Sequence, residues 1–420
     1  MNVIRGDKLQ DNSKGVYFGI ELRESYTCVS YYQINMDSPE TISTVMGANH
    51  CQIPTFLAKR RAVGQWFFGE EAKSQVKLGN ALAIEDILPK AYANEDILIE
   101  NERLKARDLL LIYIKKLLNM PGYFYANKRL LKLVIAVESL DVQVVETFAY
   151  IVSELGVARD KLMVIDFKES FYYYTLNQRP ECFLHDVVLF DYTGSELKHY
   201  YLSRNLRTTP QIVYLQDGVH GRLGDNPDLE FEEIIERVFA GKIISAVYLL
   251  GDGFDGDWLK VSLQKLCHNR KVFAGKDMYS RGACYAGAVK DGVKDWPFVY
   301  IGDNELKMNL SLKVVDKRIM EYLTLLNAGD SWYEAHGECE VILDGSGEIE
   351  IWIQKPDSRD AKVEILELTD LPERDNRTTR LRISARPTSD IEAVVTISDL
   401  GFGEIVPSSN KPWENRISLV

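Results

Sequence analysis

The feature that most constrains this chain is an apolar run near its middle that ends in a carboxylate and a turn. Residues 187–190 are apolar, Asp191 follows them, and the turn at 193–196 leads into a second strand-like segment at 197–202. This pattern predicts a β-hairpin with Asp191 at its mouth. Such a carboxylate can hold hydrated magnesium or position a water near a phosphate. It can equally be an acid in an ordinary turn.

The same pattern of a strand, an acid and a turn occurs near the start of the chain. Residues 16–20 and 26–32 alternate like two strands, and Glu21 stands where the first strand meets a polar turn. Two hairpins of one design, each with an acid at a strand end, predict a duplicated architecture.

Helical and extended patterns alternate around these hairpins, which argues for a mixed α/β layer. Asp141 can cap one helix. Gly251 and Gly253 form a turn between a strand and a helix, where a ligand can approach the backbone, although the acids beside them can instead serve the turn and the helix cap. The expected strands are residues 131–137, 162–165 and 244–250, and the expected helices are 102–119, 142–155, 170–176, 228–240 and 258–267.

The sequence pattern changes near residue 298, where helical periodicity largely disappears. Short alternating runs follow, separated by turns. They predict a separate β domain, built as a small sandwich. A loop at 400–409 invites a ligand-binding interpretation, but its glycines and serines favour a structural turn.

Composition narrows the class of protein. The net charge is -12 and the pI about 5.2, which argue against a nucleic-acid surface. The basic triplet at residues 59–61 is expected to be a solvated turn. Six widely spaced cysteines without a CxxC pair predict reduced, mostly buried thiols. The polar start, residues 1–14, predicts a flexible tail, and with no apolar run long enough to span a membrane we expect a cytoplasmic protein.

Five motifs, taken in order, resemble the actin-like ATPases, and the chain is most similar to the seventy-kilodalton heat-shock chaperones over nearly its whole length. Residues 18–29 stand where that family has its first phosphate hairpin, and residues 190–194 where it has its second. Residues 134–176 resemble the strands and helices between them. The remaining two motifs are the segment at 68–75, with the family's catalytic lysine at Lys73, and the adenosine motif at 249–253 together with 282–289.

This resemblance implies a two-lobed actin-like, or ribonuclease H-like, α/β ATPase fold followed by a C-terminal β-sandwich. Lobe I is expected at 15–185, a reduced lobe II at 186–296, and a sandwich like the chaperone substrate domain at 297–420. ATP and magnesium are the implied cofactors. The implied site has Glu21 and Asp191 as metal ligands, Lys73, Asp191 and Glu21 as catalytic residues, and Arg23, Ser25, Thr193, Gly194, Gly251 and Gly253 as nucleotide-binding residues.

The departures from the family pattern bear directly on function. Arg23 takes a glycine position in the first phosphate turn, and Glu24 and Ser25 take threonine positions. In the second turn, Thr193 and Ser195 interrupt a glycine triplet. Side chains and added negative charge thus occupy space that phosphates need, although Arg23 can itself pair with an anion.

Three functions remain open. The first is a pseudo-ATPase that acts as a binding or assembly module. The second is an active Mg-dependent ATPase with chaperone-like peptide binding, and the third is an actin-like structural polymer. The β domain can hold a protein or peptide partner by pairing with an edge strand, or it can stabilise or oligomerise the chain.

Overall fold

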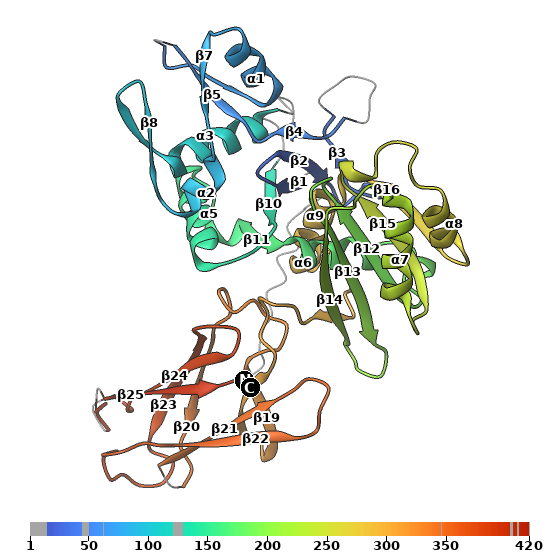
Figure 1. The fold of residues 1–420 in the computed structure, drawn as a ribbon. Coiled ribbons are helices and arrows are strands. Elements are labelled where there is room, and N and C mark those ends of the chain that lie inside the picture. The colour runs from blue at the N-terminus through green and yellow to red at the C-terminus, as the bar shows by residue number, and fades with distance from the viewer. Residues whose placement is uncertain are drawn as a thin grey trace. The chain divides into compact units, whose positions relative to one another are not determined.

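The protein has a mixed α/β structure that divides into two compact units (Figure 1). The computed structural model describes residues 15–43, 50–61, 63–120, 129–345, 347–403, 406–409 and 411–419. The expected tail at 1–14 lies outside these residues. The first unit comprises residues 1–203 with 216–296, and the second comprises 204–215 with 297–420.

The first unit contains a six-stranded sheet in which the order is β11-β10-β1-β2-β3, with β4 also paired to β2. The expected first hairpin is confirmed, since β1 and β2 are antiparallel, whereas β1, β10 and β11 run parallel. The strands are β1 (Gly15–Leu22), β2 (Tyr26–Tyr32), β3 (Glu40–Thr41), β4 (Ile53–Pro54), β10 (Arg129–Val137) and β11 (Leu162–Asp166).

A second six-stranded sheet repeats this arrangement, in the order β16-β15-β12-β13-β14-β17. The central hairpin of β12 and β13 is antiparallel, and β12, β15 and β16 run parallel, so the second expected hairpin is confirmed as well. The strands are β12 (Asp186–Tyr192), β13 (Leu197–Asn205), β14 (Gln211–Gly221), β15 (Ile244–Leu250), β16 (Lys271–Gly275) and β17 (Phe298–Tyr300).

Every residue of β1 is buried, because both faces of its sheet are covered. Val16, Phe18 and Ile20 point to a core shared with two helices, α3 (Ala106–Asn119) and α5 (Val142–Glu154). The alternate residues face α9 (Met278–Lys290), where a Cβ on Gly19 would lie 2.0 Å from a backbone oxygen of Ser280. The period of two along a strand thus assigns odd-numbered residues to the α9 face.

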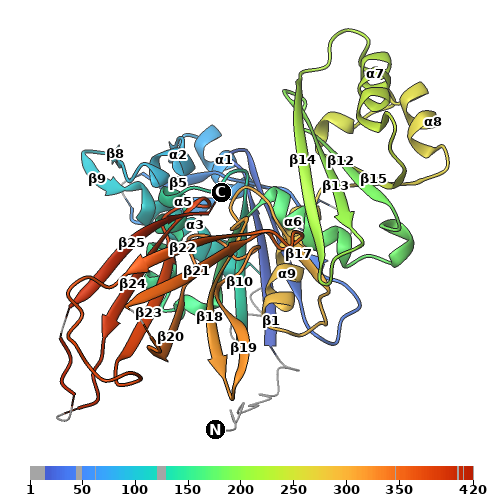
Figure 2. The same ribbon diagram turned by 90° about the horizontal axis from the view of Figure 1, so that it is seen from below.

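Two helices lie between β1 and β12 (Figures 1 and 2). They are α9 and α6 (Phe167–Leu176), which pack against each other. Their approach is close, since a Cβ on Gly282 of α9 would lie 2.2 Å from the Ser170 backbone oxygen of α6. The small-residue run at 282–289 therefore serves helix packing.

The remaining elements of the first unit surround these sheets. Asp141 caps α5 as expected, accepting a hydrogen bond from the Val144 amide at 2.8 Å. Asp228 of α7 accepts bonds from three amides at the start of α8. These elements are β5 (Leu57–Arg60), β6 (Trp66–Phe68), α1 (Gly69–Lys77), β7 (Ala81–Ile84), α2 (Ile87–Tyr92), β8 (Asp96–Ile99), β9 (Glu102–Lys105), α7 (Pro227–Phe239) and α8 (Val261–Cys267).

Two sequence predictions need correction here. The expected helix at 102–119 begins only at Ala106, because residues 102–105 pair with β8 as the strand β9. The expected solvated turn at 59–61 is wrong for Lys59, which is 8% exposed in β5 and bonds Glu102 at 2.6 Å.

The second unit contains two four-stranded antiparallel sheets that share one hydrophobic core. Their orders are β19-β18-β21-β22 and β20-β23-β24-β25. The unit also takes residues 204–215, since the start of β14 pairs with β17. The strands are β18 (Asn309–Asp316), β19 (Ile319–Leu326), β20 (Gly337–Ile342), β21 (Glu348–Gln354), β22 (Ala361–Glu367), β23 (Arg380–Pro387), β24 (Glu392–Asp399) and β25 (Pro412–Ser418).

The C-terminal loop after β24 is organised around one acid. Asp399 accepts two hydrogen bonds from Arg374, at 2.9 and 2.7 Å, and one each from the Gly401 and Ser409 amides. The bonds to described residues of this loop support the structural-turn interpretation over a ligand loop.

Candidate functional site

The two hairpins bring their terminal acids to the same place in the first unit. In β1, Glu21 is an odd-numbered residue and so shares the face of Gly19, toward α9. In β12, Val188 and Phe190 enter the core beside α7, which leaves Asp191 on the opposite face. Strand alternation therefore aims both carboxylates away from the two flanking cores.

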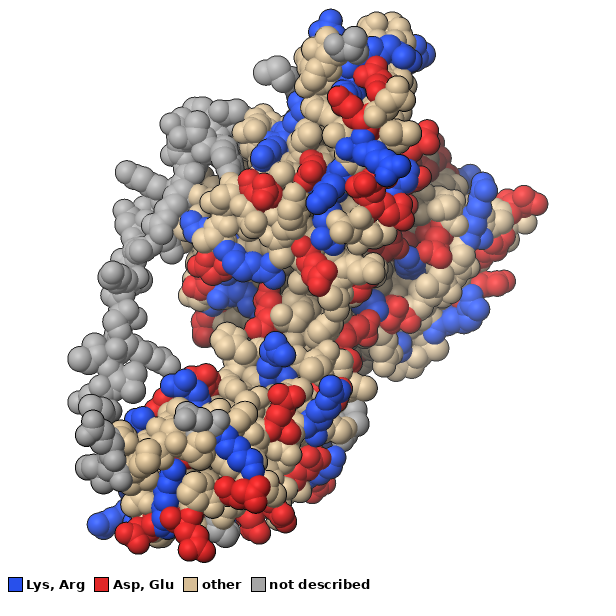
Figure 3. All heavy atoms as spheres, turned by 90° about the vertical axis from the view of Figure 1, so that its left-hand side faces the viewer, with Lys and Arg blue, Asp and Glu red and all other residues tan. Residues whose placement is uncertain are grey.

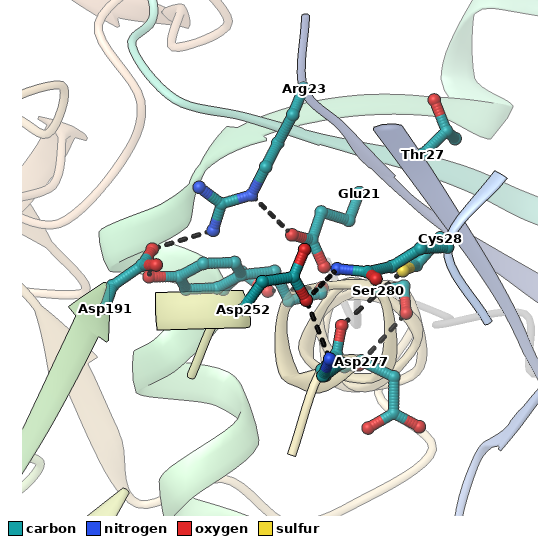
Figure 4. Close-up of polar contacts among 12 residues, drawn as sticks. Glu21, Arg23, Thr27, Cys28, Asp191, Asp252, Asp277 and Ser280 are labelled. Atoms are coloured by element: carbon teal, nitrogen blue, oxygen red, sulfur yellow. Dashed lines mark hydrogen bonds and ion pairs between the residues drawn. The ribbon is translucent and has the colours of Figure 1, made fainter. Parts of the chain in front are cut away.

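Arg23 lies between these two carboxylates (Figure 4). Its Nε donates to Oε1 of Glu21 at 2.7 Å, and one terminal nitrogen donates to Oδ2 of Asp191 at 2.7 Å. All three residues are buried, with exposed fractions of 9% for Arg23, 0% for Glu21 and 3% for Asp191. We call this group the buried triad. In it, one cation lies between two acids that are 170 positions apart in the sequence.

Aromatic rings enclose the guanidinium of Arg23. Its Cζ lies 4.6 Å from the ring centre of Phe167 and 5.3 Å from that of Tyr279, and these two rings stack at 4.3 Å. The Tyr279 hydroxyl also donates to Oδ2 of Asp191 at 3.0 Å. The guanidinium is thus held by charge at its edge and by aromatic faces, the geometry that suits arginine better than lysine.

Burial shapes the protonation of the triad. It raises the pKa of Glu21 to about 7, and Arg23 offsets only part of that rise. Burial alone lowers the pKa of Arg23, but Asp191 and Glu21 outweigh it, so the net pKa lies well above its usual range. Burial likewise raises the pKa of Tyr279 well above its usual value, which keeps the hydroxyl a neutral donor. The triad therefore holds a permanent cation beside two carboxyl groups.

Each carboxyl group keeps one oxygen without a partner. Within the described residues, Oε2 of Glu21 and Oδ1 of Asp191 accept no hydrogen bond although both are buried. An unpaired buried oxygen is costly, so these two atoms mark the place where water or another donor fits best.

A magnesium ion does not fit the triad as it stands. The two predicted metal ligands, Glu21 and Asp191, already share the guanidinium of Arg23, and a second cation between them would be repelled. Among the described residues, no group of three or more His, Cys, Asp or Glu side chains has the arrangement of a metal site.

The turn of the second hairpin has no side chain that turns inward as Arg23 does in the first. Thr193 is exposed, and its hydroxyl lies 3.1 Å from that of Ser195. Gly194 has a φ of 86°, a conformation that favours glycine. The structure thus brings Arg23 to Asp191 but leaves Thr193 in an exposed turn.

Gly251 and Gly253 bring a third segment against this turn. A Cβ on Gly251 would lie 2.3 Å from the backbone oxygen of Tyr192, and one on Gly253 would lie 2.4 Å from the Tyr192 ring. The same ring packs against Phe254 and Trp258. Both glycines therefore serve a close approach of backbone and ring, in space where the resemblance implies a nucleotide.

Two other predicted site residues lie away from the buried triad's contacts. Lys73 is exposed on α1, and its salt-bridge partner is Glu70, at 3.7 Å and three positions away. Ser25 is exposed, and its backbone oxygen accepts from the Thr55 amide.

A second polar network lies beside the triad. Nζ of Lys276 contacts Asp252 at 2.7 Å and Asp255 at 2.6 Å, and the Gln52 amide donates to Asp252 at 3.1 Å. Asp277 accepts from the Thr41 hydroxyl at 2.6 Å. Two acids of the glycine turn, Asp252 and Asp255, are therefore paired with a lysine of the chain itself.

Sequence reasoning missed the aromatic members of this site. Phe167 lies just before the helix expected at 170–176, Tyr279 lies just before the small-residue run at 282–289, and Lys276 carries no motif. A signal did exist for Tyr279, because it sits beside the small-residue run that lets α9 approach β1, but only the fold shows which side chain reaches Asp191.

A pocket of about 510 Å³ lies elsewhere in the first unit, around β5 and α1. Arg60 and Arg61 contribute to its lining, and they donate hydrogen bonds to neutral acceptors, the Gln65 side-chain oxygen and the Gly79 carbonyl. None of the predicted site residues lines it. On the face drawn in Figure 3, described basic side chains lie among acidic ones rather than in one continuous area.

Comparison with known families places the chain in one of them. A family model described as "Family of unknown function (DUF5716) C-terminal" matches residues 38–303, more than half of the chain. The chain belongs to this family. A second model, "Domain of unknown function (DUF8552)", matches residues 305–419. No curated protein matches the chain. The family match contains Asp191 and Tyr279 but begins after Glu21 and Arg23.

The described helices also bear on membrane association. None of them combines the length and the apolar character that crossing a lipid bilayer requires.

Proposed function

We propose that this protein is a pseudo-ATPase of the actin-like class, a module for binding or assembly that works without nucleotide hydrolysis. The observation that carries the proposal is the position of Arg23, whose guanidinium joins Glu21 to Asp191 inside the first unit. These are the two acids that the resemblance assigns to magnesium. An arginine of the chain thus takes the neutralising role that a divalent cation would take in a working enzyme.

The finer fold assignment belongs to the same proposal. The two six-stranded sheets have equivalent orders around their antiparallel hairpins, which supports two duplicated actin-like lobes. The shared core of the two four-stranded sheets supports a C-terminal β-sandwich.

The energy of the triad argues against nucleotide binding. Breaking a buried ion pair costs about 3–5 kcal/mol. Since about 1.4 kcal/mol corresponds to a tenfold change in affinity, displacing Arg23 weakens binding roughly a hundred- to several-thousand-fold. A site that would otherwise bind Mg-ATP with a micromolar dissociation constant then binds it with one of about 0.1 to a few millimolar.

Isothermal titration calorimetry with Mg-ATP tests the proposal directly. We expect no binding heat at micromolar nucleotide, and a melting temperature that Mg-ATP does not shift. The same titrations on Asp191→Asn and Lys73→Ala, with Lys77→Ala as the matched control on the same helix, decide the alternative. A micromolar or tighter affinity that both site variants lose and the control keeps would overturn the pseudo-ATPase assignment.

One observation favours an active Mg-dependent ATPase as the second candidate. Oε2 of Glu21 and Oδ1 of Asp191 are buried carboxylate oxygens without a partner in the described residues, and such atoms suit a metal-bound water. This function requires Arg23 to leave its present position. Phosphate release from Mg-ATP that Asp191→Asn abolishes would support it.

The second unit supplies the surface for the proposed binding role. β19 is an edge strand with six consecutive exposed residues, among them Ile319, Met320 and Tyr322. β18 pairs with β21 only over residues 309–312, so the described far end of the β18–β19 hairpin has no third strand. An edge of this kind can accept an extended protein segment.

Fluorescence anisotropy tests this surface with a short labelled peptide rich in leucine and valine. We expect the wild-type chain to bind it, and Ile319→Lys to weaken binding. Ile391→Lys, a matched change at an exposed isoleucine outside β19, should have no effect. Light scattering that rises steeply with protein concentration, in place of peptide binding, would favour the actin-like structural polymer instead.

A further inference from the structure

Two free thiols lie side by side next to the buried triad. Sγ of Cys28 is 3.8 Å from Sγ of Cys51, and also 3.5 Å from the Lys276 carbonyl oxygen. The single S–H of Cys28 therefore faces two acceptors. Figure 4 shows Cys28 near Ser280 at the start of α9. Cys28 pairs in register with Glu21 on the neighbouring strand.

Strand pairing holds these two thiols together. Cys28 belongs to β2, and Cys51 lies two residues before β4, which pairs with β2 through Thr27 and Ile53. The side chain of the intervening residue, Gln52, donates to Asp252. Both sides of the pair are thus anchored with their sulfurs 3.8 Å apart, and the bonding distance is about 2 Å.

The two thiols differ in access. Cys28 is fully buried, whereas Cys51 is partly exposed. The hydrogen bond from Cys28 lowers the pKa of Cys51, although burial and nearby acids oppose it. Donating that same hydrogen bond, together with burial, raises the pKa of Cys28. The outer thiol is thus the more readily ionised and the more reachable of the two.

The other four cysteines lack this arrangement. Cys182 and Cys284 are buried, and Cys284 contacts the Tyr17 carbonyl rather than a thiol. Cys267 is exposed, and Cys339 lies in the second unit. All six cysteines belong to the described residues, and Cys28 and Cys51 are the pair whose sulfurs are in contact.

We propose that Cys51 is a site of oxidation by hydrogen peroxide and that Cys28 resolves the product as an intramolecular disulfide. The Cys51 thiolate attacks one peroxide oxygen, which gives a sulfenic acid and releases hydroxide. The Cys28 sulfur then attacks the Cys51 sulfur, its proton leaves, and the sulfenic hydroxyl departs as water. Two thiols and one peroxide thus become one disulfide and two waters, with the peroxide reduced and each sulfur oxidised by one electron.

The disulfide has a structural consequence next to the triad, at β2 and the segment before β4. It ties the segment before β4 to β2, and it removes the S–H that faces the Lys276 carbonyl. The loop from residue 28 to 51 becomes closed in the unfolded chain, so we expect the oxidised protein to melt several degrees higher than the reduced one. This inference does not depend on whether the chain binds nucleotide.

Peptide mapping of the full chain tests the proposal. The protein is treated with hydrogen peroxide, alkylated with N-ethylmaleimide, digested with a glutamate-specific protease that cuts between the two cysteines at Glu40, and analysed by mass spectrometry with and without dithiothreitol. We expect a peptide pair joined through Cys28 and Cys51, lighter by two hydrogen atoms and separated by dithiothreitol. Cys267→Ser should behave like wild type, Cys51→Ser should form no disulfide, and Cys28→Ser should leave a sulfenic acid that dimedone traps at Cys51.

Two outcomes would overturn the proposal. One is a wild-type map in which Cys28 and Cys51 stay alkylated under peroxide that oxidises Cys267. The other is a disulfide that joins different cysteines. Because the wild-type map is decisive by itself, a variant that fails to fold leaves the test intact.

Discussion

The two hairpins of the first unit end alike in sequence and differ in how their turns are held. In the first, Arg23 turns inward and bonds both Glu21 and Asp191, and the turn is tied to the interior by charge. In the second, Thr193 and Ser195 stay in an exposed turn. That turn is held from behind by backbone packing at Gly251 and Gly253.

The difference shows how a duplicated element can lose its symmetry through one side chain. Both strands deliver an acid to the same face, so two carboxyl groups meet in a buried place. Two buried acids without a cation are strongly unfavourable. Arg23 supplies the cation that both buried acids need, so the second hairpin carries no cation for this purpose.

Replacing Arg23 by methionine should have the largest effect. The change keeps the aliphatic volume but leaves Glu21 and Asp191 buried without their cation, so we expect a loss of about 3–5 kcal/mol in unfolding free energy. Chemical denaturation measures it. Arg23→Lys is the matched control, because it retains the positive charge but not the planar guanidinium that bonds both carboxylates. It should lose less unfolding free energy than Arg23→Met. Equal losses would show that charge is unimportant here.

Asp191→Asn should come next, because it weakens two hydrogen bonds at once. Oδ2 of Asp191 accepts from both Arg23 and Tyr279, whereas the side chain of Glu21 accepts, among the described residues, only from Arg23. With charged hydrogen bonds contributing about 1.5–3 kcal/mol, we expect the Asn variant to lose at least that much and more than Glu21→Gln. Chemical denaturation of the two variants measures the difference. A larger loss of unfolding free energy in Glu21→Gln than in Asp191→Asn would contradict this prediction.

Gly253→Ala should break the packing that holds the second hairpin. The new methyl group would lie 2.4 Å from the Tyr192 ring and 2.8 Å from the Gly194 amide nitrogen, so we expect a loss of about 1–3 kcal/mol. Gly64→Ala, which adds its methyl group to open space at a φ outside the left-handed region, is the control. Melting temperatures that fall equally in both variants would argue against the close approach.

The pH dependence of stability should report on Glu21. Burial raises the pKa of Glu21 from 4.5 to about 7, so between these values the folded chain binds more protons at this site than the unfolded chain. Its contribution to stability is fully present below pH 4.5 and is lost as the pH rises through 7. The slope is at most about 1.4 kcal/mol per pH unit. Glu21→Gln should remove this fall, and an unchanged profile would refute it.

Thr193→Ala should have the smallest effect. The side chain is exposed and bonds only its turn neighbour Ser195, so we expect a change within about 0.5 kcal/mol. A larger loss would mean that the second turn, like the first, depends on its side chains.

Local patterns predicted much of this fold. The hairpins around Glu21 and Asp191, the Asp141 cap and the helix packing at Gly282 follow from alternation, turn chemistry and small residues in a helix. The polar strand β16 and the short strands β7 to β9 were missed, because they have few buried residues to reveal a period of two.

The amino-acid sequence by itself determined that two acids would stand at the ends of two similar hairpins, since strand period and turn residues are properties of a few neighbouring positions. Only the tertiary structure decided what those acids face. The inward turn of Arg23 and the Tyr279 hydroxyl both reach Asp191 from segments far away in the chain. Their partners are set by how α9 packs between two sheets, which no local pattern specifies.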